Sequence, residues 1–351
     1  MEADFFIVGQ GLAGTLLAFE LITQKKKVIV FDDPQNTKAS DVAAGLINPV
    51  VFRRMTKTAL LDVAFPQMES TYQQLEDLLG EKFYFPGQIL KLLNEEGDLL
   101  WRSKVFANQL TDYISPNPIQ PDQFEVLKST YSIGLINKSG QIDLQNLIRA
   151  FRKFFIERNL IYIEPFDYDK VAFDIEYVHY KGHSAQKIIF CEGAAASKNP
   201  FFSKIQFKHS KGEVLDVRLP NVNINETVAD EVFLMPMGND RFKVGATYSW
   251  EIQNCKTTEI ARAELLEKLK KITSVKPIVL NQLAGIRPTT HDRKPVVGLL
   301  PHCPQIGILN GLGSKGALLA PYCARLLSDV LTGNTTNIPG DINVTRYFKS
   351  I

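Results

Sequence analysis

The stretch "DFFIVGQGLAG" near the start of the chain constrains the fold more than any other feature. A short apolar run leads into three glycines with the spacing G-x-G-x-x-G, and the following "LAGTLLAFELITQ" places apolar residues at helical spacing. The run "KVIVFDD" then has the character of a second buried strand. This order of strand, helix and strand predicts the β-α-β unit that opens a dinucleotide-binding parallel sheet.

Each glycine of this loop has its own mechanical role. Gly9 allows the tight turn, Gly11 lets the backbone approach a pyrophosphate, and Gly14 permits close packing of the helix on the strand. Asp32 ends the second strand, where its carboxylate can accept hydrogen bonds from ribose hydroxyls and disfavours a 2′-phosphate. The alternative is a plain tight turn followed by a surface Asp. The loop alone does not separate NAD from FAD.

The next segment, "KASDVAAGLINPV", is rich in small residues. Small side chains let the backbone lie close to a bulky flat group, although a flexible surface loop would have a similar composition. The predicted cofactor contacts outside the first glycine loop and Asp32 are therefore Asp33, Ser40, Ala43, Ala44 and Gly45, with Val171 and Gly193 further along the chain.

A second loop of the same form, "GLGSKG" at 311–316, lies near the other end of the chain. Only one predicted helix follows it, without a second strand ending in an acid, so a second dinucleotide fold is not expected. A helix N-terminus still presents free N–H groups that can stabilise a group gaining negative charge. We expect this loop to face the cofactor, with an ordinary strand–helix turn as the alternative. Its candidate contacts are Gly311, Gly313, Ser314, Lys315 and Gly316.

The remaining patterns indicate the domain organisation. "IDLQNLIRAFRKFFIERN" predicts an amphipathic helix, "KIIFCEGAA" a buried strand, and residues 79–139 have mixed patterning with many turn residues. From 211 onward, short strand-like runs favour antiparallel pairing, and "TTEIARAELLEKLKKIT" predicts a helix with a Thr cap. We predict an α/β protein, α+β overall. A Rossmann-like cofactor domain comprises 1–78, 140–206 and 285–351, and an antiparallel-sheet-plus-helix substrate domain comprises 79–139 and 207–284.

Composition argues against several function classes. The net charge of +2 gives no reason to expect strong non-specific nucleic-acid binding, although a local basic patch is compatible with it. No apolar run is long enough to span a membrane, and no secretory signal is visible, so a cytoplasmic protein without a membrane partner is expected. The four cysteines are scattered, the five histidines lack metal-ligand spacing, and no G-x-S-x-G elbow appears. His291 is expected to be structural.

Several motifs together resemble one enzyme family. In chain order they are "IVGQGLAG", "VIVFDD", "AAGLINP", "IIFCEGAA", "VGATY", "LAGIRPTTHDRKPVVG" and "GLGSKGALLAP". Over nearly the whole chain they resemble the D-amino-acid oxidase and glycine oxidase family of FAD enzymes. The form "GLGSKG…AP" is most similar to the FAD-dependent oxidase domain of the bifunctional enzyme that modifies the tRNA wobble uridine. The methyltransferase domain normally fused to that domain is not in this sequence.

The resemblance implies FAD as cofactor and oxidation of a C–N bond by hydride transfer to the flavin. It implies that Arg287 in "GIRP" holds a substrate carboxylate and lies among the cofactor contacts; a surface ion pair is the alternative. Tyr248 in "GATY" is expected to bind the same carboxylate or to shape the pocket, or else to be a core or rim residue. Lys315 is expected near the flavin pyrimidine, unless it is solvated. The family's glycine oxidases carry an aromatic or basic residue where this loop has "LGS", and this departure concerns the substrate, not the cofactor.

Three functions follow. The first is an FAD enzyme acting on a small carboxylate-bearing amine, either an amino acid or an N-substituted glycine. The second is a tRNA-modification oxidoreductase that cleaves the carboxymethylaminomethyl side chain of wobble uridine, which a basic surface at the pocket mouth would favour. The third is a non-enzymatic FAD-binding protein. The electron acceptor and the oligomeric state are left open.

Overall fold

The expected β-α-β unit opens the structure. β1 (Glu2–Val8) leads through the glycine loop into α1 (Leu12–Thr23), which is followed by β2 (Val28–Asp32). β1 pairs in parallel with β2 and with β11 (His183–Phe190), in a register that brings the ends of the three strands level. The computed structural model describes residues 1–35, 37–124, 126–128, 130–251 and 254–348.

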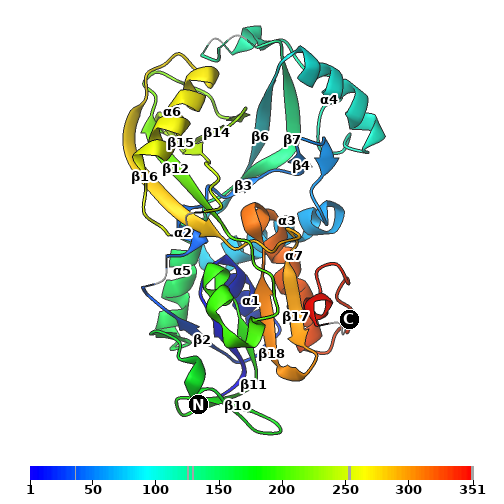
Figure 1. The fold of residues 1–351 in the computed structure, drawn as a ribbon, viewed down its shortest axis with the longest axis vertical. Coiled ribbons are helices and arrows are strands. Elements are labelled where there is room, and N and C mark those ends of the chain that lie inside the picture. Colours follow the sequence, from blue (N-terminus) through cyan, green and yellow to red (C-terminus); the bar gives the residue numbers. More distant parts are fainter. Residues whose placement is uncertain (36, 125, 129, 252–253, 349–351) are drawn as a thin grey trace.

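The first sheet, in the lower half of Figure 1, is mostly parallel and has β1 near its centre. Parallel pairing joins β18 to β11, β11 to β1, β1 to β2 and β2 to β8, while β17 adds an antiparallel edge. β10 and β9 extend it beside β11. The further strands are β8 (Ile161–Ile163), β9 (Ala172–Phe173), β10 (Val178–Tyr180), β17 (Val296–Leu300) and β18 (Cys303–Asn310).

The second sheet, in the upper half of Figure 1, is antiparallel except where β13 meets β6. Its order is β16, β12, β15, β14, β13, β6, β7, β3. The strands are β3 (Leu46–Ile47), β6 (Tyr84–Leu93), β7 (Ser132–Ile142), β12 (Ser210–Arg218), β13 (Thr227–Ala229), β14 (Phe233–Pro236), β15 (Arg241–Gly245) and β16 (Ile278–Arg287). A separate small ribbon joins β4 (Val50–Val51) to β5 (Thr56–Lys57).

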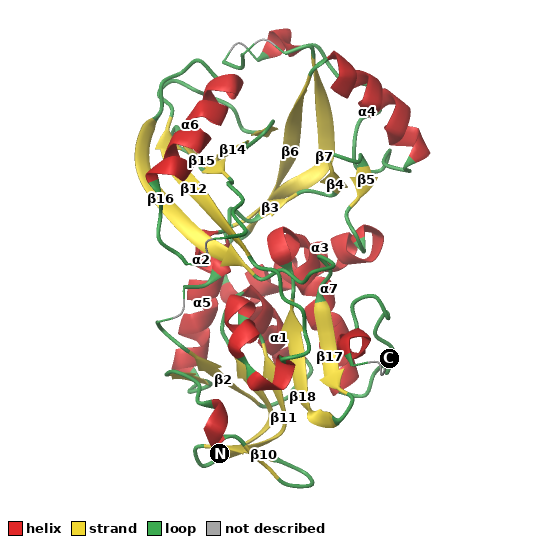
Figure 2. Cartoon of the chain, in the orientation of Figure 1, coloured by secondary structure: helices red, strands yellow, loops and turns green. Residues whose placement is uncertain are grey.

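Helices cover both sheets, as Figure 2 shows. The main core packs apolar residues of α1, α3 (Leu61–Leu79), α5 (Leu144–Glu157) and α7 (Gly316–Leu331) against one face of the first sheet. α6 (Glu259–Ile272) begins at the predicted cap, where the Thr258 hydroxyl accepts from the Ala261 amide, and it packs on the second sheet. The remaining helices are α2 (Ala39–Val42) and α4 (Glu95–Ala107). The predicted fold class is confirmed.

The two sheets draw on different segments of the chain. Strands of the first sheet fall within 2–32, 161–190 and 296–310, and those of the second within 46–47, 84–142 and 210–287. β7 and β16 each cross a predicted boundary by three residues, at 139/140 and 284/285, and β3 of the first predicted segment joins the second sheet. The domain boundaries stay a prediction.

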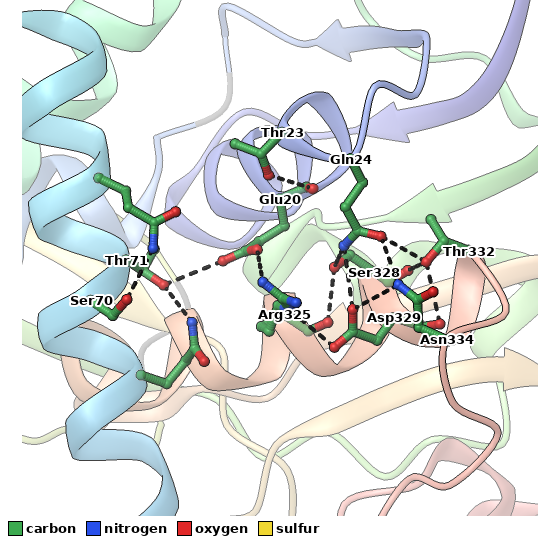
Figure 3. Close-up of polar contacts among 12 residues, drawn as sticks. Glu20, Thr23, Gln24, Ser70, Thr71, Arg325, Ser328, Asp329, Thr332 and Asn334 are labelled. Carbon is green, nitrogen blue, oxygen red and sulfur yellow. Dashed lines mark hydrogen bonds and ion pairs between the residues drawn. The ribbon is translucent and has the colours of Figure 1, made fainter.

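A cluster of polar side chains around the buried Glu20 joins α1, α3 and α7 (Figure 3). Glu20 of α1 is only 3% exposed and accepts a hydrogen bond from the Thr71 hydroxyl of α3 at 3.3 Å. Its other carboxylate oxygen lies 3.7 Å from an Arg325 nitrogen of α7, and Arg325 also pairs with Asp329. Burial nevertheless raises the pKa of Glu20 from 4.5 to about 7, and Arg325 offsets only part of that effect.

This pKa predicts a pH-dependent gain in stability for Glu20→Gln. Between pH 4.5 and about 7 the unfolded chain has lost the Glu20 proton while the folded protein retains it, so wild-type stability falls as pH rises through that window. Glutamine avoids this loss and keeps a partner for Thr71. We expect Glu20→Gln to exceed wild type by about 2–3 kcal/mol above pH 7 and to match it near pH 4.5.

Urea unfolding of the cofactor-loaded protein at pH 5 and pH 8 measures this difference, with exposed Glu267→Gln on α6 as the matched control. Equal shifts in both variants, or no dependence on pH, would contradict a buried proton at Glu20.

Candidate functional site

A cavity of about 1170 Å³ lies where the parallel strands of the first sheet end and the second sheet begins. Its wall is formed by the first glycine loop, the segment around α2, the ends of β11 and β18, and the facing parts of β12 and β16. Ligand pockets usually measure about 300–1,000 Å³, so this cavity can hold a dinucleotide. Most of the predicted site residues line it.

The first glycine loop has the expected geometry. Gly9 has φ +96°, a conformation that side chains disfavour, and its amide donates to the Phe31 carbonyl at 2.7 Å. A Cβ at Gly14 would lie 1.9 Å from the Gly9 carbonyl oxygen, so only glycine lets α1 pack this closely. Gly9 and Gly11 line the cavity, while Gly14 lies behind them as a packing residue.

Asp32 is buried at the cavity wall, with 2% exposure, and its carboxylate is already well bonded. One oxygen accepts from the Gln10 amide at 2.7 Å. The other accepts from the Lys38 ammonium at 2.8 Å and from the Arg152 guanidinium of α5. Arg152 also donates to the Gln10 side chain at 2.7 Å. Sequence reasoning found Asp32 but not Lys38 or Arg152, which fix the position of its charge.

The small-residue segment reaches the cavity as expected. The Ser40 hydroxyl of α2 accepts from the Leu12 amide in the first turn of α1 at 3.1 Å, which places the two helix starts side by side. Gly45 packs directly against β7, because a Cβ at this position would lie 1.9 Å from the Ile142 carbonyl oxygen. The predicted residues of this region that line the cavity are Asp32, Asp33, Ser40, Ala43, Ala44 and Gly45.

The end of β11 contributes more than Gly193. Gly193 lines the cavity, and so do Glu192 and Tyr168, which sequence reasoning missed. Glu192 accepts from the Tyr168 hydroxyl at 2.5 Å and from the Asn199 amide at 2.8 Å, yet burial raises its pKa to about 7. Val171 is not among the described residues on the cavity wall, although it lies close in sequence to Tyr168.

Arg287 lies at the end of β16, where that strand leaves the second sheet. Its guanidinium donates to the carbonyls of Lys211 at 3.2 Å and Thr247 at 3.1 Å, and it lies 3.9 Å from the centre of the Tyr248 ring. Burial lowers the pKa of Arg287 below its usual value, and the group remains a cation. A Cβ at Gly212 would fall 2.1 Å from a terminal guanidinium nitrogen, so Gly212 provides the space that Arg287 occupies.

The second glycine loop closes the cavity on the other side. It forms a 3-10 turn, Gly313–Lys315, between β18 and α7, and the Gly313 amide donates to the Pro288 carbonyl at 2.9 Å. The Lys315 ammonium donates to the Asn48 carbonyl at 2.8 Å. Gly313, Ser314, Lys315 and Gly316 line the cavity, whereas Gly311 packs against backbone behind it.

Other candidates lie elsewhere. His291 is exposed, and its amide donates to the Gln206 carbonyl outside the cavity wall. Within the described ranges, no three His, Cys, Asp or Glu side chains are grouped closely enough to hold a metal ion. No helix in the same ranges has the length and apolar character needed to cross a membrane.

Comparison with known proteins places this geometry in context. The family model described as FAD dependent oxidoreductase matches residues 4–330. Glycine oxidase of Bacillus licheniformis is 24% identical, with 94% of this chain and 93% of that protein covered. The crystal structure of glycine oxidase from Geobacillus kaustophilus superposes with a TM-score of 0.85 at 21% identity, covering 98% of this chain and 99% of that one.

Part of the chain also matches a protein that is named for tRNA modification. The tRNA 5-methylaminomethyl-2-thiouridine biosynthesis bifunctional protein MnmC of Hahella chejuensis is 28% identical over 152 residues. The match covers 39% of this chain and 24% of that protein.

Proposed function

The chain belongs to the family of FAD dependent oxidoreductases, and on that premise we propose that it oxidises a C–N bond of a small amino acid or an N-substituted glycine. When bound, FAD supplies an acceptor for a hydride from the carbon next to nitrogen. The observation that carries the proposal is Arg287, whose guanidinium lies in the wall of the cavity that can hold the cofactor.

The residues present fit FAD. Gly9 and Gly11 expose backbone at the N-terminus of α1, which suits a pyrophosphate, and a side chain at Gly9 would meet the Cys191 carbonyl. Asp32 places a fixed carboxylate where ribose hydroxyls can donate. We propose that the loop 311–316 lies against the flavin ring, because its small residues line the same cavity and it begins α7.

Arg287 is well prepared to bind a carboxylate. Two of its N–H groups donate to backbone carbonyls, and its guanidinium lies against the Tyr248 ring. The side chain is therefore already held in place before a ligand binds. The remaining N–H groups can form charge-assisted bonds to a carboxylate, which would fix the neighbouring α-carbon in one orientation. In this proposal Arg287 binds the substrate and Tyr248 shapes its pocket.

The test is anaerobic bleaching of the bound flavin by glycine, N-methylglycine, larger D- and L-amino acids, and an anticodon stem-loop carrying the carboxymethylaminomethyl uridine. Bleaching by a carboxylate-bearing amine is expected. Failure of every one of these carboxylate-bearing amines to bleach the flavin would overturn the proposal.

One observation favours the tRNA substrate as a second candidate. Trp250 lines the cavity and is 41% exposed, and the cations of Lys208 and Arg293 lie 5.6 and 5.7 Å from its ring. Aromatic rings beside cations are typical of surfaces that bind nucleic-acid bases and phosphates. Bleaching by the modified stem-loop alone would favour this candidate.

The contact between Gly212 and Arg287 makes a separate prediction. In Gly212→Ala the new methyl group would displace the guanidinium, because that group is the mobile end of a long side chain and can move more easily than the strand. We expect KM for the substrate to rise about tenfold, equivalent to about 1.4 kcal/mol, with FAD content and Tm unchanged.

The double variant Gly212→Ala/Arg287→Ala is the critical comparison. If Gly212 acts through Arg287, the double variant has the kinetics of Arg287→Ala alone. Additive losses would show that Gly212 has another role.

A further inference from the structure

The two backbone carbonyls that accept from Arg287 belong to β12 and to the segment that follows β15. Ser249 of that segment exchanges two backbone hydrogen bonds with Lys211 of β12, at 2.8 and 3.0 Å. The Thr247 amide donates to the Glu213 carbonyl at 3.2 Å, and the Thr247 hydroxyl accepts from the Glu213 amide at 2.9 Å. The position of the Arg287 guanidinium therefore depends on how this segment lies along β12.

Glu213 is a buried carboxylate beside these carbonyls, with 2% exposure. One of its oxygens lies 3.2 Å from the Lys211 ammonium and accepts from the Thr258 hydroxyl at 3.0 Å. The other accepts from the Thr258 amide at 2.9 Å and from the Gln282 side-chain amide at 2.8 Å. Burial alone would raise the pKa of Glu213, but these bonds together outweigh it and hold the pKa below its usual value. The carboxylate is therefore charged at neutral pH.

Glu213 thus binds both ends of one segment, residues 247–258. Its backbone pairs with Thr247 at the first end, and its carboxylate holds Thr258 at the second, where α6 begins. The segment carries Tyr248, whose ring centre lies 3.9 Å from the guanidinium that the Thr247 carbonyl accepts from. One buried side chain therefore connects the start of α6 to the groups that surround the guanidinium.

We propose that Glu213 is a positioning residue for substrate binding, because it joins the two ends of segment 247–258 and so holds the Thr247 carbonyl and Tyr248 against Arg287. The inference rests on the proposed function. Glu213 is not among the described residues that line the cavity, so it acts through the neighbours of Arg287. A guanidinium with fixed acceptors presents its free N–H groups to a carboxylate in one orientation. Loosening the segment should weaken substrate binding before it affects the chemical step.

The first test compares two acids of β12. Glu213→Gln and Asp216→Asn each remove the carboxylate partner of a buried lysine, since Asp216 lies 3.3 Å from the buried Lys243 ammonium in the same sheet. Both variants should lower Tm, because a buried cation without its partner is destabilising. In steady-state kinetics, only Glu213→Gln should raise KM for N-methylglycine, by about tenfold, with kcat within about twofold of wild type. FAD content should not change. Equal changes of KM in the two variants would overturn the proposal.

The double variant Lys211→Met/Glu213→Gln separates the lost bonds to Thr258 from the effect of an unpaired lysine. It removes both charges, so Tm should recover while KM stays raised. It also provides the comparison if Glu213→Gln alone does not fold. Recovery of KM together with Tm would show that the unpaired cation, not the tie between the two ends of the segment, caused the loss, and would refute the role of Glu213.

A second measurement needs no turnover. Acetate has a carboxylate but no amine, so it can bind without being oxidised, and its dissociation constant is measured from the change in flavin absorbance. We expect that constant to rise about tenfold in Glu213→Gln, for the same reason as KM. An unchanged constant would contradict the proposal.

A double-mutant comparison tests whether Glu213 acts through Arg287. Arg287→Ala and Arg287→Ala/Glu213→Gln should have the same kcat/KM for N-methylglycine. A further loss in the double variant would overturn the positioning role. Wild-type flavin that no carboxylate-bearing amine reduces would instead refute the proposed function, and the acetate comparison would still test Glu213.

Discussion

Replacing Arg287 by alanine is expected to lower kcat/KM for a carboxylate-bearing amine by tens- to hundreds-fold, mainly through KM. Loss of a charge-assisted pair costs roughly 2–4 kcal/mol, and the carbonyls of Lys211 and Thr247 would lose their donor as well. FAD content should stay unchanged, because Arg287 donates to the backbone of Lys211 and Thr247 and makes no hydrogen bond to the first glycine loop. Steady-state kinetics and the absorbance ratio of the purified protein measure the two effects separately.

Two further variants sharpen this result. Arg287→Lys keeps the charge but loses the planar fork, so its kcat/KM should lie between those of wild type and the alanine variant. Arg149→Ala removes an exposed arginine from α5 and should have no effect. If Arg287→Ala shows unchanged kinetics with a carboxylate substrate, Arg287 does not bind that substrate.

Gly14→Ala is expected to abolish stable FAD binding and to destabilise the fold by about 3 kcal/mol or more. The new Cβ would lie 1.9 Å from the Gly9 carbonyl oxygen. Neither atom can rotate away, because the backbone fixes the positions of both. Relief requires α1 to move away from β1, which also displaces Gly11 from the cavity wall. FAD retention after gel filtration and thermal unfolding measure these effects.

Gly87→Ala is the matched control, since a Cβ at Gly87 in β6 would have no atom within 4 Å. It should retain FAD and unfold at the wild-type temperature. A Gly14→Ala protein that retained FAD with an unchanged Tm would show that the loop can relax, and the close packing of α1 would not be required.

The part of the cavity wall around the first glycine loop could be predicted because its signal is local. The tight turn, the start of α1 and Asp32 at the end of β2 all belong to one β-α-β unit. Their spacing in the sequence alone therefore indicates how they meet in space. Arg152 has no such signal. It comes from α5, far along the chain, and only the packing of that helix brings it to Asp32. Gly212 likewise gives no sign in sequence that its missing side chain accommodates Arg287.

The elements that sequence patterns missed have ordinary physical reasons. α3 carries Pro66 in its first turns, which masks the amphipathic pattern of a long helix. β6 contains Pro86 and Gly87 near its start, and its register with β7 shifts just after Gly87, so strand alternation is interrupted. Residues 79–139 therefore had mixed patterning, although β6, α4 and β7 are regular in the structure.

The position of β1 in its sheet has a consequence for how the chain folds. β1 is synthesised long before β11, yet β11 is one of its two neighbours, and Val8 pairs with Phe190. While the chain is being synthesised, the β1–α1–β2 unit is present before β11. One edge of β1 and much apolar surface are exposed until then. Contacts this distant in sequence slow folding and favour aggregation. We therefore expect nascent chains that end before residue 183 to depend on chaperones, and stable cofactor binding to begin only after β11 has emerged.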